Sequence, residues 1–449
     1  MIEVKHDHKL TFPDIKVPMY NENQPDGPDI IKQSEIEGTL VPLLRFNDQI
    51  ITFEMVNSMT LRCDTVPSIT VEITDYLELI RLIDSPDRDN ILYLQILPPF
   101  DDAYKKIQLA FYITDTDING QTITMSGTYY VPKLFNNVMK PYGCISTYEL
   151  FDQISNDYSL GFCSNVENVD DQRYIYNPNQ KPIQFLSKEI QFAGNKEHVF
   201  DWWIDFWNNI NLVDLYNEYT TIESDDDLLV WVGNTFKDTN DENTPQQQIA
   251  AFTNIPAMAA SPFYIGEYET TSSTGGVTDL NLEVYSMKDA DRHSTVIQDG
   301  DVFNDVFMDY TYGGEVFGDF DYISRLSTRN FFLSKIYSNC IKVTTNIPMI
   351  ALMKGGHVNL WWYETNNWMA DKIDFSEVES NIPIPDGEGK FSTSDLTMTL
   401  NRTVSGQYYI MNVEYNYLGH MNWEVTYTLS RAADGVQKLN PPSNETFLK

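Results

Sequence analysis

The stretch from Ser146 to Tyr219 constrains the fold of this chain most, because helix start and stop signals follow one another closely within it. Ser146 stands three residues before Glu149, which is the spacing of a capping box, where side-chain oxygens and backbone N–H groups satisfy each other at a helix start. Gly161 ends that helix, and an extended piece begins after it. Pro182 suits the first turn of a second helix, because its missing N–H would have no helical partner there.

A cluster of aromatic residues follows the second helix. Six large apolar side chains stand within eight positions, at Phe200, Trp202, Trp203, Ile204, Phe206 and Trp207. We expect a third helix here, with Asp201 and Asp205 one turn apart. Most of its circumference must be covered, because a surface helix would not carry so many apolar neighbours. Residues 208–219, whose apolar residues are bounded by Asn, predict a strand.

Strand signals fill the sequence on both sides of this stretch. Residues 36–145 contain short runs rich in Ile, Val, Thr and Tyr, separated by Asp, Asn, Pro and Gly, as a compact antiparallel sheet or barrel requires. Strands resume in residues 331–431, and near the end of this segment the alternation has a period of two, which a half-buried β-hairpin needs. The sequence therefore predicts an α+β chain that is dominated by β-strands.

Composition and punctuation divide the 449 residues into six parts. We predict an extended N-terminal arm (1–35), a first strand-rich segment (36–145), a helical insert (146–219), an acidic α+β or loop excursion (220–330), a second strand-rich segment (331–431) with an insertion at 364–393, and a flexible tail (432–449). The arm, which four prolines space out, is expected to lie on its own barrel or on a neighbouring subunit.

The chain is strongly acidic, with 65 acidic and 30 basic residues and a formal charge of −35. This balance argues against binding to nucleic acid, which needs Lys and Arg to replace condensed counterions, and against binding to an anionic membrane surface. A negative wall suits a DNA conduit, because repulsion keeps a passing polyanion from sticking, but acidity also serves solubility alone. No apolar run reaches about eighteen residues and the N-terminus has no apolar secretory segment, so we expect neither a membrane span nor a signal peptide.

The cysteines give no sign of a disulfide framework, because none of them forms a C-x-x-C pair. We expect small buried side chains in a reducing cytoplasm at Cys63, Cys144, Cys163 and Cys340.

Several short motifs in the insert stand in an order that resembles one known family. They are a capped helix start, a Gly-Phe exit followed by Asn, an aromatic run that ends in Trp-Ile-Asp, and a Val-Asp-Leu run. Their residues are Ser146 and Tyr148, Gly161, Phe162 and Asn165, Phe200 to Asp205, and Leu212 to Leu215. This ordered set resembles the central baseplate hub proteins of contractile phage tails, which are related to phage late control proteins and to the hub part of type VI secretion spikes.

The second strand-rich segment is similar to the same family. The run from Lys354 to Val358 resembles a tight turn before a strand that closes a barrel, which explains its glycines. The family's closing hairpin is similar to the region that contains Ser405, Gly406, Gln407, Tyr408, Tyr409, Ile410, Val413, His420, Leu429 and Arg431. The resemblance covers residues 36–219 and 331–431.

The resemblance implies two small tube-like antiparallel β-barrels, at 36–145 and 331–431, joined by a helical or α+β domain. It implies a structural virion protein, a homotrimer whose six barrels form a ring between a sixfold tail tube protein and a threefold central spike protein. Baseplate wedge or other baseplate proteins would contact this ring, and genomic DNA would pass through it without specific binding.

The implied location is the phage tail baseplate, assembled in the host cytoplasm. No lysozyme-like domain or β-helical needle follows in the sequence, so the spike is expected to be a separate chain. The hub of a contractile injection system and the hub of a non-contractile tail stay open as alternatives.

Asp201 and Asp205 offer an enzymatic alternative. A carboxylate pair beside tryptophan platforms is typical of glycoside hydrolases, which makes a glycan-degrading enzyme the alternative from a different class. Against it, the two carboxylates would share one helix face with no sign of a facing cleft wall. The resemblance also implies a structural role for Asp205, as an acceptor at a packing corner. We therefore predict no catalytic residue and no enzyme activity.

Nothing in the sequence predicts a metal or cofactor site. His6 and His8 form one short tract without a second cluster, so a solvated arm is expected there. The acidic runs 225–227 and 238–243 lack the EF-hand spacing and are expected to be solvated loops. No ligand spacing surrounds the other histidines, which are His198, His293, His357 and His420.

Overall fold

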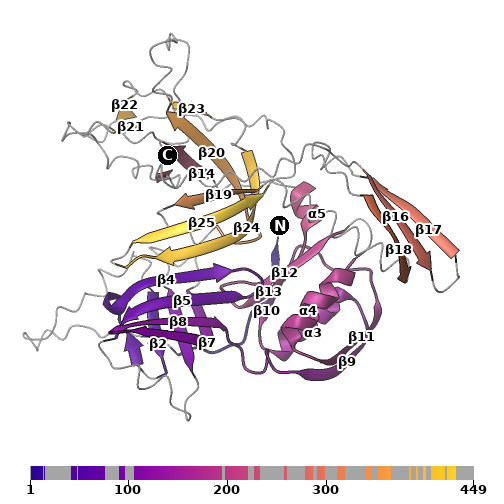
Figure 1. Cartoon of the computed structure of the whole chain (residues 1–449), viewed down its shortest axis with the longest axis horizontal. Helices are drawn as coiled ribbons and strands as arrows, with labels where there is room; N and C mark the ends of the chain where they lie inside the picture. Colours follow the sequence, from indigo (N-terminus) through magenta and orange to yellow (C-terminus); the bar gives the residue numbers. More distant parts are fainter. Residues whose placement is uncertain are drawn as a thin grey trace, which may run out of the picture.

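The structure is a computed structural model of the chain (Figure 1). It describes residues 2–13, 15, 42–47, 49–75, 90–96, 106–194, 198–220, 227–232, 257–259, 279–286, 291–298, 311–318, 340–345, 352–365, 384–385, 391–392, 398–400, 406–419 and 422–430.

The first strand-rich segment folds into an antiparallel sheet in the order β4-β5-β8-β7-β6-β2-β3. Its strands are β2 (Pro42–Phe46), β3 (Gln49–Ile51), β4 (Val56–Cys63), β5 (Pro67–Thr74), β6 (Ile91–Ile96), β7 (Ile107–Asn119) and β8 (Thr122–Tyr129), and a short 3-10 helix, η1 (Phe53–Met55), separates β3 from β4. Buried and less buried residues alternate along β5, as the period of two predicts. The buried face carries Ile69, Val71 and Ile73 into the core.

The second strand-rich segment contributes further strands to the same sheet. They are β19 (Cys340–Thr345), β20 (His357–Thr365), β23 (Met398–Leu400), β24 (Gly406–Tyr417) and β25 (Trp423–Ser430). β24 and β25 form the predicted antiparallel hairpin, and β19 pairs with the outer side of β25. Two strands of the predicted excursion, β14 (Asp227–Val232) and β15 (Ala257–Ala259), extend the sheet beyond β20 through parallel pairing.

The two segments meet where β4 pairs antiparallel with β24. We call this pairing the seam. Thr60 faces Asn416 across it and Arg62 faces Glu414, with a Thr60 Oγ1 to Asn416 Oδ1 distance of 2.7 Å. Each strand would otherwise expose an edge of unpaired backbone groups, so the pairing satisfies both. The result is one continuous 14-stranded sheet. The β-dominated fold is confirmed, whereas the closure of the segments into two separate barrels stays a prediction.

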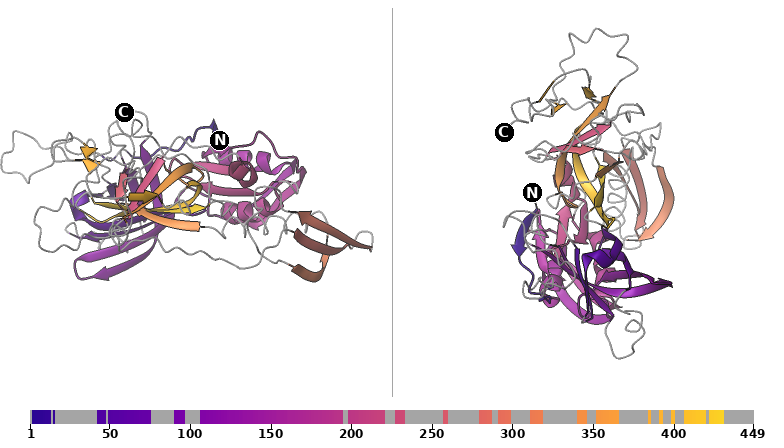
Figure 2. Two further views of the ribbon diagram at one scale, coloured as in Figure 1. Left: turned by 90° about the horizontal axis from the view of Figure 1, so that it is seen from above. Right: turned by 90° about the vertical axis from the view of Figure 1, so that its left-hand side faces the viewer.

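The insert lies at one end of the joined sheet (Figures 1 and 2). Its strands and helices are β9 (Val138–Ile145), α3 (Thr147–Asp157), β10 (Gly161–Ser164), β11 (Arg173–Gln180), α4 (Pro182–Glu189), η2 (Ile190–Phe192), β12 (Phe200–Ile204), β13 (Asn209–Asp214) and α5 (Leu215–Thr220). The helices predicted from Ser146 and from Pro182 are both present as α3 and α4. β9 belongs by sequence to the predicted first segment, 36–145, but it pairs with β11 of the insert in a separate two-stranded ribbon and not with the other strands of that segment.

The N-terminal arm joins the insert. β1 (Glu3–His6) pairs antiparallel with β10 at one edge of a four-stranded sheet in the order β1-β10-β13-β12. Helices α3 and α4 lie between this sheet and the β9–β11 ribbon (Figure 1). β1 therefore lies on the insert, where it was not expected, whereas the Ile15 N–H donates to the Gln95 side chain of β6 in the first strand-rich segment, where the arm was expected.

The prediction of a helix over the aromatic cluster is wrong, because Phe200–Ile204 is strand β12. Successive residues of a strand point to opposite faces, so Trp202 and Trp203 pack on different sides. Trp202 makes an edge-on contact with Phe151 of α3, and Trp203 packs against Gly355 before β20. A strand covered on both faces reads as a continuous apolar run, which explains the misreading. The strand predicted over 208–219 ends at Asp214, where α5 follows.

The remaining described strands form two small sheets. One contains β16 (Asp279–Ser286), β17 (Asp291–Gln298) and β18 (Thr311–Gly318), and the other pairs β21 (Ile384–Pro385) with β22 (Phe391–Ser392). The acidic run 238–243, His420 and the tail 432–449 lie outside the described residues, as does most of the insertion 364–393. No helix within the described ranges is long and apolar enough to cross a membrane.

Candidate functional site

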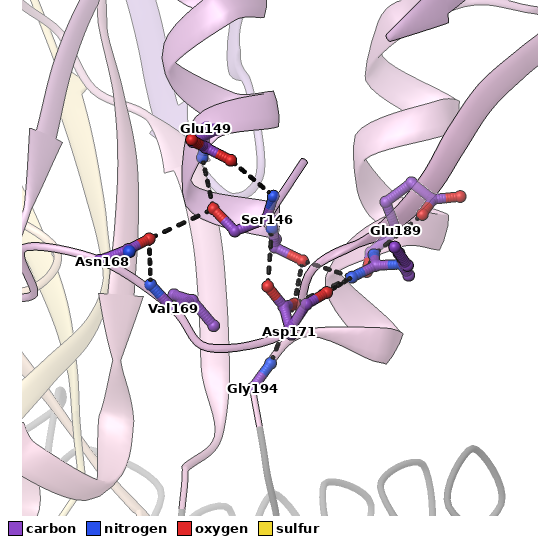
Figure 3. A network of polar contacts seen from close by, with 9 residues as sticks. Ser146, Glu149, Asn168, Val169, Asp171, Glu189 and Gly194 are labelled. Atoms are coloured by element: carbon purple, nitrogen blue, oxygen red, sulfur yellow. Dashed lines mark hydrogen bonds and ion pairs between the residues drawn. The ribbon is translucent and has the colours of Figure 1, made fainter. Parts of the chain in front are cut away.

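Buried carboxylates connect the strands, helices and turns of the insert, and Asp171 is one of them (Figure 3). Its side chain is fully buried and accepts hydrogen bonds from the backbone N–H and the hydroxyl of Thr147, at 2.8 and 2.5 Å. The backbone N–H of Gly194 and the guanidinium of Arg173 also donate to it, at 3.2 and 2.9 Å. One carboxylate therefore joins the start of α3, the start of β11 and the chain after η2.

Arg173 extends this network to the second helix. Its other guanidinium nitrogen lies 2.9 Å from the carboxylate of Glu189, the last residue of α4. The capping box adds the remaining connection, because Glu149 N donates to the Ser146 hydroxyl and Ser146 N donates to the Glu149 carboxylate. The Ser146 hydroxyl also lies 3.3 Å from Asn168 (Figure 3). The predicted capping box is confirmed, and it is one corner of a larger polar network.

Asp205 holds the turn between β12 and β13. It accepts hydrogen bonds from the backbone N–H groups of Trp207 and Asn209, both at 2.9 Å, and from the side-chain amides of Asn209 and Asn211. Burial of the carboxylate raises the pKa of Asp205, and these hydrogen bonds oppose the shift. Asp205 therefore has the structural role that the resemblance implied.

The same turn is fixed to the first segment through Asn208. Its φ of 61° lies in the left-handed region, which Asn tolerates better than most residues. The Asn208 side chain accepts a hydrogen bond from the Tyr129 hydroxyl at 2.7 Å and donates to the Gln108 carbonyl at 2.9 Å. Burial raises the pKa of Tyr129 well above its usual range, so this hydroxyl stays a donor.

Asp201 and Asp205 do not share a helix face, because Asp201 lies within β12 and Asp205 lies in the following turn. Asp201 has Lys354 as a neighbour, with 3.9 Å between the ammonium nitrogen and the carboxylate. Lys354 also donates to the Asp64 carbonyl and lies 5.0 Å from the centre of the Trp203 ring. Asp205 is already occupied by four donors. The residues on which the glycoside hydrolase alternative depends thus serve separate local contacts.

A second polar cluster joins the insert to the second strand-rich segment. Asn165, the Asn of the Gly-Phe-x-x-Asn motif, exchanges hydrogen bonds with the backbone of Asp214 and donates to Glu218 at 2.8 Å. The fully buried Asp214 carboxylate lies 2.5 Å from His198 Nδ1. Glu218 of α5 lies 3.2 Å from His357 Nε2 at the start of β20. Burial lowers the pKa of His357.

Gly355 marks the closest contact between three distant parts of the chain. Its φ of +90° is in the region that favours glycine. A Cβ at this position would lie 2.5 Å from the Trp203 ring and 2.9 Å from Ile2 Cδ1. The glycine pair noted in the sequence therefore lets the second segment, the insert and the arm pack together, a role that no local pattern revealed.

The histidines and cysteines do not form a metal site within the described part of the chain, where no three His, Cys, Asp or Glu side chains are grouped to hold an ion. His6 was expected in a solvated arm, but its Nε2 lies 3.0 Å from Ser155 and 3.2 Å from Asp152 of α3. His293 lies in β17. The histidines thus take separate structural positions.

The cysteines differ from one another in exposure. Cys63 and Cys163 are buried as predicted, and burial raises the pKa of the Cys63 thiol to about 12. Cys144 is exposed, so the prediction of a buried side chain is wrong there. It lies on the outer face of the β9–β11 ribbon, whose inner face packs on the helices, and strand alternation decides which side a residue takes.

No family model matches the chain, and no curated protein matches it. Among solved structures, it is similar to the tail protein from Neisseria meningitidis MC58, with 9% identity and a TM-score of 0.47 over 89% of this chain and 98% of that one. The 43 kDa tail protein of prophage MuSo2 from Shewanella oneidensis has 9% identity and a TM-score of 0.46, over 88% and 97%.

A third similar structure is an E. coli type VI secretion system component described as similar to T4 bacteriophage tail proteins gp27 and gp5. It has 10% identity and a TM-score of 0.35, over 86% of this chain and 77% of that one. These neighbours are phage tail and type VI secretion proteins, the kind of protein that the sequence motifs resemble.

Proposed function

We propose that this chain is a structural phage tail protein, and more specifically the homotrimeric central hub of a baseplate. In this function it connects the sixfold tail tube protein to a threefold central spike protein, contacts other baseplate proteins and surrounds part of the DNA channel. It performs no catalysis. The two strand-rich segments form two tube-like barrels, one at 36–145 and one at 331–431, and three chains supply six barrels.

The observation that carries this proposal is the seam. A trimer resolves a mismatch between sixfold and threefold partners only if each chain offers two similar units side by side. Residues 56–63 and 406–417, which are far apart in the sequence, pair as β4 and β24 and bring the two segments into one sheet. Repeating this arrangement around a threefold axis would continue the sheet into a ring.

The insert supports the proposal through its connections. It is tied to the first segment by Asn208 and Tyr129 and to the second by Glu218 and His357. A part that contacts both segments can hold them at a fixed angle, as a junction that transmits force between tube and spike needs. The formal charge of −35 is also compatible with a wall that repels passing DNA.

The test is the solution mass of the purified chain, measured by light scattering with and without a candidate spike protein. Three copies of the 51.8 kDa chain give about 155 kDa. We expect this trimer, or a monomer that spike converts into a complex with three copies of each chain. A monomer that ignores the spike would contradict the proposal.

Two further measurements separate the alternatives. A glycan-hydrolysis assay of the chain and of Asp201→Asn tests the carbohydrate-active enzyme, and we expect no activity in either. Neighbouring genes for a contractile sheath distinguish a contractile phage tail or injection system from a non-contractile tail. A contractile injection system uses the same trimeric hub, so the mass measurement applies to it unchanged.

A further inference from the structure

The N-terminal arm contacts three distant parts of the chain in turn. At one end, Ile2 lies against the turn before β20, because a Cβ on Gly355 would come within 2.9 Å of Ile2 Cδ1. β1 follows and pairs with β10 of the insert. At the other end, the Ile15 N–H donates to the Gln95 side chain of β6 at 3.3 Å. The arm therefore bridges the second strand-rich segment, the insert and the first strand-rich segment.

The middle of the arm lies at the surface of the molecule. None of residues 2–13 is buried, and Val4 within β1 is 60% exposed. His6 Nε2 lies 3.0 Å from the hydroxyl of Ser155 in α3, and the Lys9 N–H donates to a backbone carbonyl just after α3 at 2.8 Å. Segments that bury little apolar surface open at a lower free energy than the core. The arm is therefore expected to open more easily than the strands beneath it.

The surface under the arm is buried, in contrast to the arm itself. Phe162 and Cys163 of β10, which pair with β1, are both buried, and so is Gln95 under the other end. The second edge of β10 pairs with β13. Release of β1 would therefore leave β10 as an edge strand with unpaired backbone groups. This favours the closed arrangement of the arm, although the arm itself buries little surface.

The two ends of the arm support each other. Ile15 is 3% exposed, so its burial anchors the arm to the first strand-rich segment. Once one end of a segment is anchored, docking of the other end is intramolecular and loses less conformational entropy. Release of Ile15 removes this advantage, so β1 and Ile2 should leave their sites more easily. The ends are therefore expected to be coupled, although they contact different parts of the chain.

We propose that residues 2–13 and Ile15 form a clasp, which opens and closes as one unit while the parts under it stay folded. In the closed state the clasp holds the insert and the second strand-rich segment to the first. In the open state it releases Gly355 and leaves one edge of β10 unpaired. The contacts involved lie within one copy of the chain, so the inference does not depend on the proposed function.

The test changes one end of the clasp and measures the other. Ile15→Ser removes the buried anchor, and hydrogen exchange followed by mass spectrometry measures the amides of β1. We expect these amides to exchange about tenfold faster than in the wild type, because burial of one aliphatic side chain changes an opening equilibrium by at least that factor. The amides of β5 should keep the wild-type rate. Ile118→Ser makes the same substitution at a side chain that is 41% exposed on β7, so this matched control should change neither rate.

A second variant reverses the direction of the test. His6→Ala removes the contacts of β1 with α3, and the Ile15 amide should then exchange about threefold faster, a smaller effect because His6 is only partly buried. The wild type alone supplies a third readout, in which β1 should exchange faster than β13 of the same sheet. Wild-type β1 that exchanges only as fast as β13, or either folded variant in which the far end keeps its wild-type rate, overturns the clasp.

Discussion

The strand-rich segments and the insert are stabilised in different ways. In the strand-rich segments, apolar residues alternate along each strand, so β5 buries Ile69, Val71 and Ile73 on one side. The insert buries apolar residues as well, among them Phe151 and Trp203, but it also encloses the carboxylates of Asp171 and Asp214, each of which accepts from at least two donors. Non-directional burial tolerates small shifts, whereas a buried carboxylate needs each donor in place. The insert is therefore the more geometrically defined part of the molecule.

The largest effect is expected at Asp171. Asp171→Ala should lower the free energy of unfolding by about 4 kcal/mol, because it leaves Arg173, Thr147 and the Gly194 N–H without their shared acceptor. Urea denaturation measures this change. Asp170→Ala, one residue away and exposed, is the matched control and should change stability by less than about 0.5 kcal/mol. Equal effects of the two substitutions would show that the insert does not depend on the buried Asp171 carboxylate.

Asp205 should give the next largest effect. Asp205→Ala removes the acceptor of four hydrogen bonds from the half-buried turn before β13, and we expect a loss of about 2 kcal/mol in the same denaturation experiment. Asp201 has Lys354 at 3.9 Å as a neighbour in place of such donors, so Asp201→Ala should lower the free energy of unfolding by less than about 1 kcal/mol. If Asp201→Ala were the more destabilising substitution, the assigned roles of the two residues would be reversed.

The capping box sharpens the comparison within one helix. Ser146→Ala should cost about 1 kcal/mol, since it removes the acceptor of the Glu149 N–H at the start of α3. Glu149→Gln keeps the reciprocal hydrogen bond to the Ser146 N–H and should be close to neutral. Thermal unfolding followed by circular dichroism distinguishes these results, and a neutral Ser146→Ala would show that the wider network holds the helix without its cap.

The smallest effect is expected at the seam. Arg62 and Glu414 form an ion pair with 2.8 Å between nitrogen and oxygen, but their side chains are 53% and 31% exposed. Exposed pairs contribute little, so a double-mutant cycle of Arg62→Ala and Glu414→Ala should give a coupling of about 0.5 kcal/mol. A coupling above about 2 kcal/mol would mean that the strand-rich region also depends on specific charges.

The helices and strands that could be predicted from the sequence are those whose signals come from residues close together in the chain. Ser146 with Glu149, Pro182 and the alternation in β24 and β25 are local signals, and the structure places a capped helix, a second helix and a hairpin there. The Asp171 network could not be found in the same way. Its partners Thr147 and Gly194 are 24 and 23 residues from Asp171, and no periodicity connects them.

The misread strand β12 shows where a signal existed but was ambiguous. A short apolar run is compatible with a buried strand or a buried helix, and length decides between them. The run from Phe200 to Ile204 has only five residues, and Asn208-Asn209 after it is a turn signal. Gly355 covers the Trp203 ring, and no pattern among neighbouring residues of the sequence could have placed these two residues side by side.

Because of the seam, β4 has to wait for its partner strand β24 while the chain is being synthesised. Thr60 and Asn416, which contact each other across it, are separated by 356 residues. At about 5–20 residues per second, the ribosome needs roughly 20–70 s between making the two. Throughout that time β4 can fold with β5 while its other edge awaits β24, and an unpaired strand edge invites pairing with other chains. Nascent chains on one messenger lie close together, so the same edge that completes the finished sheet is where premature association between unfinished copies would start.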